Sequence, residues 1–344
     1  MEPAARKQKI LAAIVESYID NGEPVGSKSL ITETGLNVSS ATVRNDMAEL
    51  TSLGYIVQPH TSAGRIPTAL GYRYYVDNVM RVTPISGQGR QYVLEELQKN
   101  ADSPESILRG AADLLSKLSG QAAVTTTPGG DNSRIRRISF VQTGAHSAMV
   151  VLIASNGTIK TKLFRCEFLI TPELLGVFDK ALNEIFAGVT LSSVNRPFIQ
   201  TVAVRFGELS LLMPSVLMAI QDASEQAAAV SVCQSGKGRL AFAPDVDFQS
   251  ARRVIEFLNN SQDLAKTLEK APRHTAALIG RENSRIELAN NSLITTRYSV
   301  DGNPSGVAAL ITPLRTDYQR CFALLECVAE CAGELIGELI DSQE

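Results

Sequence analysis

Residues 39–68 read SSATVRNDMAELTSLGYIVQPHTSAGRIPT, and this stretch decides the fold of the N-terminal part of the chain. The Ser39 side chain suits a helix N-cap, and Val43, Met47 and Leu50 follow it at helical spacing. The stretch therefore predicts a helix that buries one side. The opposite side holds small or polar residues: Ala41, Arg44, Asn45, Ala48 and Ser52, with Thr42 and Glu49 on the flank.

Two short extended runs come next, YIVQP at 55–59 and RIPT at 65–68, and each contains a proline that cannot donate to the interior of a sheet. This pattern predicts two edge strands joined as a hairpin, with Gly64 at a positive φ at the tip. Four side chains offer hydrogen-bond donors where the loop projects: His60, Thr61, Ser62 and Arg65.

Upstream, apolar residues recur at helical spacing over 5–20, NGEP at 21–24 ends that helix, and Ser27 is the predicted cap of a short second helix. A long helix followed by two closely coupled short ones is typical of a helix-turn-helix, whose second helix enters the DNA major groove. A hairpin after such a motif is a wing. Residues 69–80 predict a helix that packs back on this unit, and VTPISGQG at 82–89 is the predicted domain boundary.

The rest of the chain predicts an α+β, multidomain protein. A strong helix at 103–120 precedes three strands, RISFVQTG, AMVVLIA and TIKTKLF, within 137–164. Residues 171–273 are helix-rich, strands resume at TAALIG near 275, and a long helix occupies about 317–340. We expect one sheet that is interrupted by a separate insertion.

Length and composition limit the class of protein. At 344 residues and 37.0 kDa the chain is long enough for two or three domains. Its longest clean apolar run, at 148–154, is far shorter than the ~18 residues of a membrane helix. Glu16 and Asp20 interrupt any signal-peptide core, and the five cysteines include no CxxC pair. We expect a protein of the reducing cytoplasm.

Catalytic and cofactor sites are not expected. Cys321, Cys327 and Cys331 could hold a metal or form a buried helix stripe, and the absence of a nearby histidine in the sequence favours the stripe. SGKGR at 235–239 lacks the spacing of a phosphate loop and predicts a hairpin turn. An enzyme would need paired carboxylates or a nucleophile beside a base, and an RNA-binding regulator would need interleaved aromatic residues; neither pattern occurs.

The charge balance is unusual for a DNA-binding protein. The net charge is −3 with a pI near 5.8, and residues 1–81 hold eight basic and eight acidic side chains. Because phosphate neutralisation supplies much of DNA affinity, the basic groups would have to gather on one side. Two copies that act together on two half-sites would also compensate for a weak module.

The run SSATVRNDMAELTSLGYIVQPHTSAGRIPTALGYRYYVD at 39–77 resembles the signature region of the HrcA family of bacterial heat-inducible transcription repressors. GRENS at 280–284 and TPLRTDY at 312–318 are similar to weaker blocks of the same family. This resemblance implies three parts: a winged helix-turn-helix at 1–82, a GAF-like domain in two segments at 83–170 and 274–344, and an inserted dimerisation domain at 171–273.

The resemblance also implies a function. Family members repress chaperone operons of the groE/dnaK class by binding an inverted-repeat operator as homodimers, and the GroE chaperonin maintains their activity. The implied DNA-binding residues are Ser39, Ser40, Thr42, Arg44 and Asn45 on the recognition helix, and His60, Thr61, Ser62 and Arg65 on the wing. The alternative is a ligand-gated winged-helix repressor with a small effector in the GAF-like domain.

Overall fold

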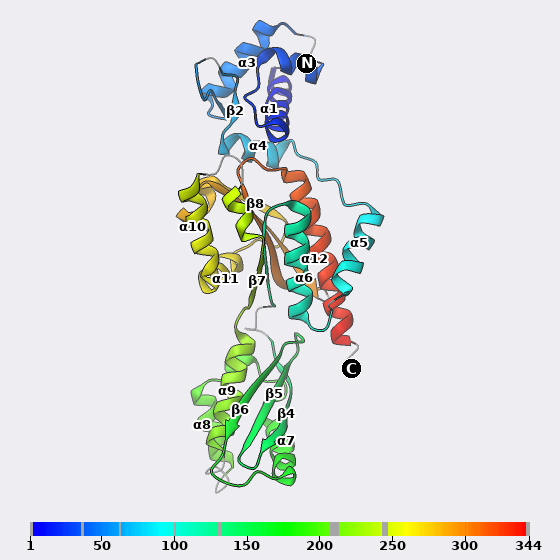
Figure 1. The fold of residues 1–344 in the computed structure, drawn as a ribbon, viewed down its shortest axis with the longest axis vertical. Helices are drawn as coiled ribbons and strands as arrows, with labels where there is room; N and C mark the ends of the chain where they lie inside the picture. The colour runs from blue at the N-terminus through cyan, green and yellow to red at the C-terminus, as the bar shows by residue number, and fades with distance from the viewer. Residues whose placement is uncertain are drawn as a thin grey trace.

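The computed structural model describes most of the chain: residues 3–35, 38–61, 63–99, 101–128, 133–206, 213–242, 247–300 and 302–341. Three parts follow one another along the long axis of the molecule (Figure 1). We call them the head (residues 3–78), the body (residues 87–126 and 232–341) and the outer unit (residues 133–228). The outer unit and the head lie at opposite ends of the body.

The head contains four helices and a two-stranded hairpin. They are α1 (Pro3–Asn21), α2 (Ser27–Thr34), α3 (Ser40–Ser52), β1 (Ile56–Val57), β2 (Ile66–Pro67) and α4 (Ala69–Asn78). The predicted helix after Ser39, the hairpin and the helix after Thr68 are confirmed. The prediction that Ser27 caps the second helix is wrong. Helix α2 begins at Ser27 itself, and Gly26 holds the cap position without a side-chain hydrogen bond.

The body is built on a five-stranded antiparallel sheet in the order β7-β3-β10-β9-β8. Its strands are β3 (Ala122–Thr126), β7 (Val232–Ser235), β8 (Ala276–Ile279), β9 (Asn291–Val300) and β10 (Asn303–Pro313). Its α-helices are α5 (Gly87–Gln98), α6 (Pro104–Ser119), α10 (Phe248–Asn259), α11 (Ser261–Glu269) and α12 (Tyr318–Asp341). Short 3₁₀ turns are η3 (Lys237–Phe242), η4 (Gly280–Glu282) and η5 (Ile286–Leu288).

Alternation along the strands sends side chains to two cores. On one face, Ala123 and Leu310 pack with α5, α6 and α12. On the other face, Val124 and Ile311 pack with α10 and α11. The body is therefore a three-layer arrangement, with helices on both sides of the sheet (Figure 1).

The outer unit has its own sheet, and this differs from the expectation of a single interrupted sheet. Its elements are β4 (Ile135–Gly144), β5 (Ser147–Ala154), β6 (Ile159–Arg165), α7 (Pro172–Phe186), η1 (Leu191–Ser193), α8 (Arg196–Arg205) and α9 (Pro214–Ala228). The three strands pair only with one another, in the order β4-β5-β6, and they share a separate core with α7 and α9. Because β7 already pairs with β3, the chain returns to the body near residue 232 rather than near 274.

Of two local predictions about the body, the hairpin at 235–239 is corrected and the cysteine stripe is confirmed. The predicted hairpin at 235–239 is wrong, since β7 pairs with β3 and the chain then enters η3. The predicted cysteine stripe is confirmed, because Cys321, Cys327 and Cys331 are free thiols buried along α12. Burial raises the pKa of Cys321 to about 11, which suppresses its thiolate. Among the described residues, no group of three or more His, Cys, Asp or Glu is arranged to hold a metal ion.

Candidate nucleic-acid interface

Helix α3 presents the polar face that the sequence predicts. The Ser39 hydroxyl accepts a hydrogen bond from the Thr42 backbone amide at 3.1 Å, so the cap of the helix is formed. Val43, Met47 and Leu50 are buried in the head. The residues on the opposite side are exposed: Ala41, Arg44, Asn45, Ala48, Glu49 and Ser52. Figure 1 places α3 at the end of the head that is remote from the body.

Arg44 is exposed and lies beside the first turn of α2. Its Nε donates to the Ser27 hydroxyl at 3.3 Å, and that hydroxyl is also 3.3 Å from the Ser40 hydroxyl. Ser40 and Thr42 are half-buried, whereas Ser39 and Asn45 are exposed. The structure thus brings four predicted residues together around the α2–α3 junction: Ser39, Ser40, Thr42 and Arg44. Ser27 of α2 joins them.

Two ion pairs on α3 were not predicted. Asp46 is only 4% exposed, and both of its oxygens accept from Arg6 of α1, at 2.6 and 3.1 Å. The hydrogen bond to Asp46 raises the pKa of Arg6 above its ordinary value. Lys7 pairs with Glu49 in the same way, across the same two helices. Helical spacing could not identify these pairs, because their partners are 40 and 42 residues apart in the sequence.

These ion pairs change how the charge balance is understood. Arg6 and Lys7 hold α1 against α3 and neutralise acidic groups on α3, so they are not free to bind phosphate. The same pairing weakens the negative field of Asp46 and Glu49 at the α3 surface. Arg44 is therefore an exposed cation on a face whose neighbouring carboxylates are compensated.

The loop of the hairpin is organised by a side chain that the sequence analysis did not single out. The Gln58 amide donates to the carbonyls of Thr61 and Ala63, at 2.9 and 3.0 Å. The Ala63 amide donates to the His60 carbonyl at 2.9 Å, which closes a turn at the loop tip. His60 and Thr61 are exposed there. Ser62, the third predicted loop residue, lies outside the described residues.

Arg65 does not lie at the projecting tip. Its backbone pairs with Val25 through two hydrogen bonds of 2.9 Å, so the hairpin base extends onto the α1–α2 turn. Its half-buried side chain donates through Nε to the Thr51 hydroxyl on α3 at 3.2 Å. Arg65 therefore lies between the hairpin and the last turn of α3.

Gly64 is required for a reason other than the predicted positive φ. It does not have a left-handed backbone conformation. A Cβ at this position would lie 2.4 Å from the Val25 carbonyl oxygen and 2.7 Å from the Pro24 carbonyl carbon. The absence of a side chain thus permits the close approach that docks the hairpin on the α1–α2 turn.

Known proteins are similar to this chain over most of its length. The family described as "HrcA protein C terminal domain" matches residues 105–322. The chain belongs to the HrcA family. A heat-inducible transcription repressor HrcA from Acetivibrio thermocellus is 30% identical over 93% of this chain and 92% of its own length. The protein of the same name from Chromobacterium violaceum is 32% identical over 94% of this chain and 96% of its own.

A solved structure shares the overall fold. The crystal structure of a hypothetical protein superposes with a TM-score of 0.62 at 23% sequence identity, and it covers 97% of this chain and 98% of that chain. This similarity supports the mixed α+β, multidomain architecture of the family member. No helix in the described part of the chain is long and apolar enough to cross a membrane.

Proposed function

We propose that the head is a winged helix-turn-helix that binds double-stranded DNA, with α3 in the major groove and the β1–β2 hairpin as the wing. The observation that carries this proposal is the exposed face of α3, where Arg44 and Asn45 stand beside the capped N-terminus of the helix. N-terminal residues of a recognition helix contact base edges in this motif. His60 and Thr61 would contact the sugar–phosphate backbone from the exposed loop.

The proposed target is an inverted-repeat operator of chaperone genes of the groE/dnaK class, bound in the cytoplasm. The name of the relatives, heat-inducible transcription repressor HrcA, supports this target. Maintenance of the active form by the GroE chaperonin is part of the same proposal. A repressor whose active form depends on a chaperonin would release its operator when unfolded proteins occupy that chaperonin.

Dimerisation is assigned to the outer unit, and the body is the proposed GAF-like domain. One face of the β4–β6 sheet is covered by helices, and the other carries apolar side chains in register: Val141, Met149, Val151, Ile153, Ile159 and Leu163. Val141, Ile159 and Leu163 are 47%, 48% and 58% exposed. An open antiparallel face normally carries polar residues, so this apolar face supports contact with a second copy.

The test is selection from random-sequence duplexes followed by gel-shift titration at fixed salt. We expect the wild-type protein to select an inverted repeat and to bind it about a thousandfold more tightly than random duplex. Equal affinity for selected and random DNA would contradict the proposal.

Arg44→Ala and Arg65→Ala should have different effects on DNA binding. If Arg44 contacts a base edge, its loss should reduce discrimination at one base pair by about 1–3 kcal/mol, because a bidentate contact is lost. Arg65 adjoins the hairpin, and its loss should weaken binding to all sequences about equally. Gel shifts on the selected operator, on single-base variants and on random duplex measure both. If both substitutions reduce affinity for all three DNAs equally, the base-reading role of Arg44 is excluded.

A ligand-gated repressor is the second candidate, and a cleft in the body favours it. The cleft has a volume of about 670 Å³ between β9 and α12, within the size range of small-molecule sites, and charged residues of both signs line it, including Arg297 and Glu330. Native mass spectrometry of the purified protein would detect a retained small molecule. Addition of that molecule should then change operator affinity.

A further inference from the structure

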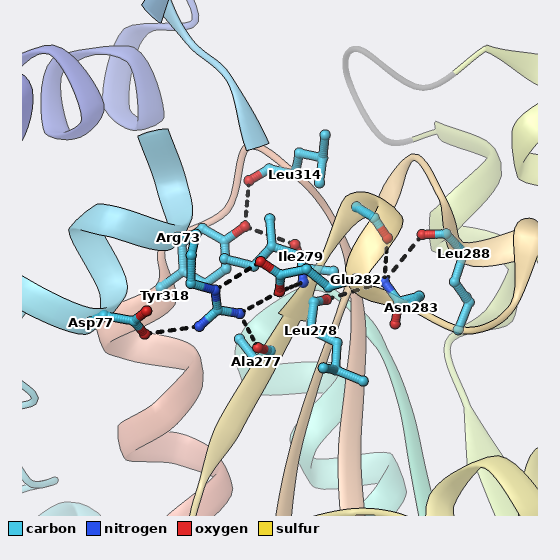
Figure 2. Close-up of polar contacts among 12 residues, drawn as sticks. Arg73, Asp77, Ala277, Leu278, Ile279, Glu282, Asn283, Leu288, Leu314 and Tyr318 are labelled. Atoms are coloured by element: carbon cyan, nitrogen blue, oxygen red, sulfur yellow. Dashed lines mark hydrogen bonds and ion pairs between the residues drawn. The ribbon is translucent and has the colours of Figure 1, made fainter. Parts of the chain in front are cut away.

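The head is attached to the body by an arginine fork. Arg73 of α4 donates through Nε and Nη2 to the two oxygens of Glu282, at 2.9 and 2.6 Å, and it also donates to the Ala277 carbonyl of β8 (Figure 2). Its Nη1 bonds Asp77 one turn along α4 at 2.9 Å. A planar bidentate pair of this kind restricts orientation as well as distance, which a single-point contact with lysine would not do.

Glu282 is held rigidly on the side of the body. Its Oε2 accepts from the Ile279 amide at 2.8 Å, at the end of β8. The adjacent Asn283 is buried, and its amide nitrogen lies 2.9–3.3 Å from the carbonyl oxygens of Leu278, Gly280, Leu288 and Asn291. Burial alone would raise the pKa of Glu282, but the hydrogen bonds from Arg73 and Ile279 outweigh it and lower this pKa. Glu282 is therefore a carboxylate anion at the end of η4, in a turn that these hydrogen bonds hold in place.

Aromatic and backbone contacts oppose rotation of the head about this fork. The rings of Tyr72 on α4 and Tyr318 on α12 lie 5.7 Å apart, and the Tyr318 hydroxyl bonds Ser292 and the Leu314 carbonyl. Gln319 donates to the Tyr75 hydroxyl at 3.0 Å. Arg315 of the body also donates through Nη1 to the Ile19 carbonyl of α1 at 3.2 Å. Along the chain the two parts are connected by residues 80–86, which contain no helix or strand.

These contacts bring together the two segments of the body that are similar to the weaker blocks of the HrcA family. GRENS at 280–284 supplies Glu282 and Asn283, and TPLRTDY at 312–318 supplies Leu314 and Tyr318. Both blocks lie where the body meets the head, whereas α3 lies at the end of the head that is remote from the body (Figure 1). Their position at the junction indicates a role in the placement of the head.

We propose that Arg73 and Glu282 are positioning residues that set the separation and angle of the two α3 helices in the dimer, and thereby the half-site spacing that the protein accepts. This inference rests on the proposed function, because it requires two heads on one inverted repeat. A base pair added between the half-sites moves them apart by about 3.4 Å and rotates one by about 35°. Rigid heads cannot follow that change, whereas heads that are loosened at the junction by loss of the bidentate pair can.

The experiment uses the full-length protein and the inverted repeat selected by the wild type. Duplexes with the central spacer lengthened or shortened by two base pairs, and a duplex with a single half-site, are titrated in gel shifts. The variants are Arg73→Gln and Glu282→Gln. Asp77→Asn is the matched control, because Asp77 bonds Arg73 within α4 and does not cross to the body.

For the wild type and Asp77→Asn, we expect about a 100-fold loss of affinity on the altered spacers, since simultaneous engagement of both half-sites is lost. For Arg73→Gln and Glu282→Gln, we expect a loss below about tenfold on the same spacers, with half-site affinity within about twofold of the wild type. Glu282 lies outside the head, so its variant tests the inference even if Arg73→Gln impairs folding of α4.

Two outcomes would overturn the inference, and only the first of them would also overturn the proposed function. If the wild type tolerates all spacers or selects no repeat, the proposed dimer on an inverted repeat fails, and the positioning role fails with it. If the wild type is sensitive to spacing and both glutamine variants keep its spacing profile, the DNA-binding function stands and the positioning role is wrong.

Discussion

The double substitution Val141→Asp and Leu163→Asp is expected to convert the protein into a monomer with about 100-fold lower affinity for the inverted repeat. Both residues pair with Met149 in the sheet register, so they form one row across the open face of β4–β6. A carboxylate buried without a partner costs several kcal/mol, and a two-fold contact would bury four of them. Folding should be little affected, because both side chains are already largely exposed in the single chain.

Sedimentation velocity measures the oligomeric state, and gel shifts on the repeat and on a single half-site measure binding. Half-site affinity should not change, because the head is untouched. Val177→Asp is the matched control, since this valine is 55% exposed but lies on α7, which covers the other face of the sheet. A dimer that survives the double substitution, or one that Val177→Asp dissociates, would place the interface elsewhere.

Gly64→Ala should release the hairpin from the α1–α2 turn. The added methyl group would lie 2.4 Å from the Val25 carbonyl oxygen and 2.5 Å from its carbon, and a backbone neighbour cannot rotate away. Overpacking of this kind costs about 3 kcal/mol, at the upper end of its usual range. The two hydrogen bonds between Val25 and Arg65 would be the first lost.

Hydrogen exchange at the Val25 and Arg65 amides tests this expectation at the site itself. Exchange should accelerate about 100-fold, since local opening becomes easier by about 3 kcal/mol. Affinity for operator DNA should fall with it, because Arg65 and the loop tip lose their position relative to α3. Gly87→Ala is the control, because a Cβ there meets nothing within 4 Å. Unchanged exchange at the two amides would show that the backbone can yield without cost.

Much of the head could be predicted from local signals. The Ser39 cap and the spacing of Val43, Met47 and Leu50 identify α3 and its exposed face, because a helix repeats its environment every three to four residues. The prolines at 59 and 67 limit the hairpin to short strands. Helix α4 and the long α12 were found in the same way.

Strand pairing could not be predicted with the same success. The alternation in 137–164 identifies strands, but it does not say whether they join β9 and β10 or only one another. Both solutions satisfy the backbone, and the choice depends on which helices cover the sheet. Helix α5 was also missed, because VTPISGQG at 82–89 suggests a break and the structure starts a capped helix at Gly87 within it.

The sequence by itself determined the helices of the head, the hairpin, the polar face of α3 and the relation to a repressor family, because caps, periodicity and motifs depend on residues that are close together in the sequence. Only the tertiary structure decided that Asp46 is neutralised by Arg6, that Arg65 lies at the base of the hairpin, and that Arg73 reaches Glu282. These contacts join residues that are distant along the chain. Their distances depend on how whole elements pack, which no local pattern specifies.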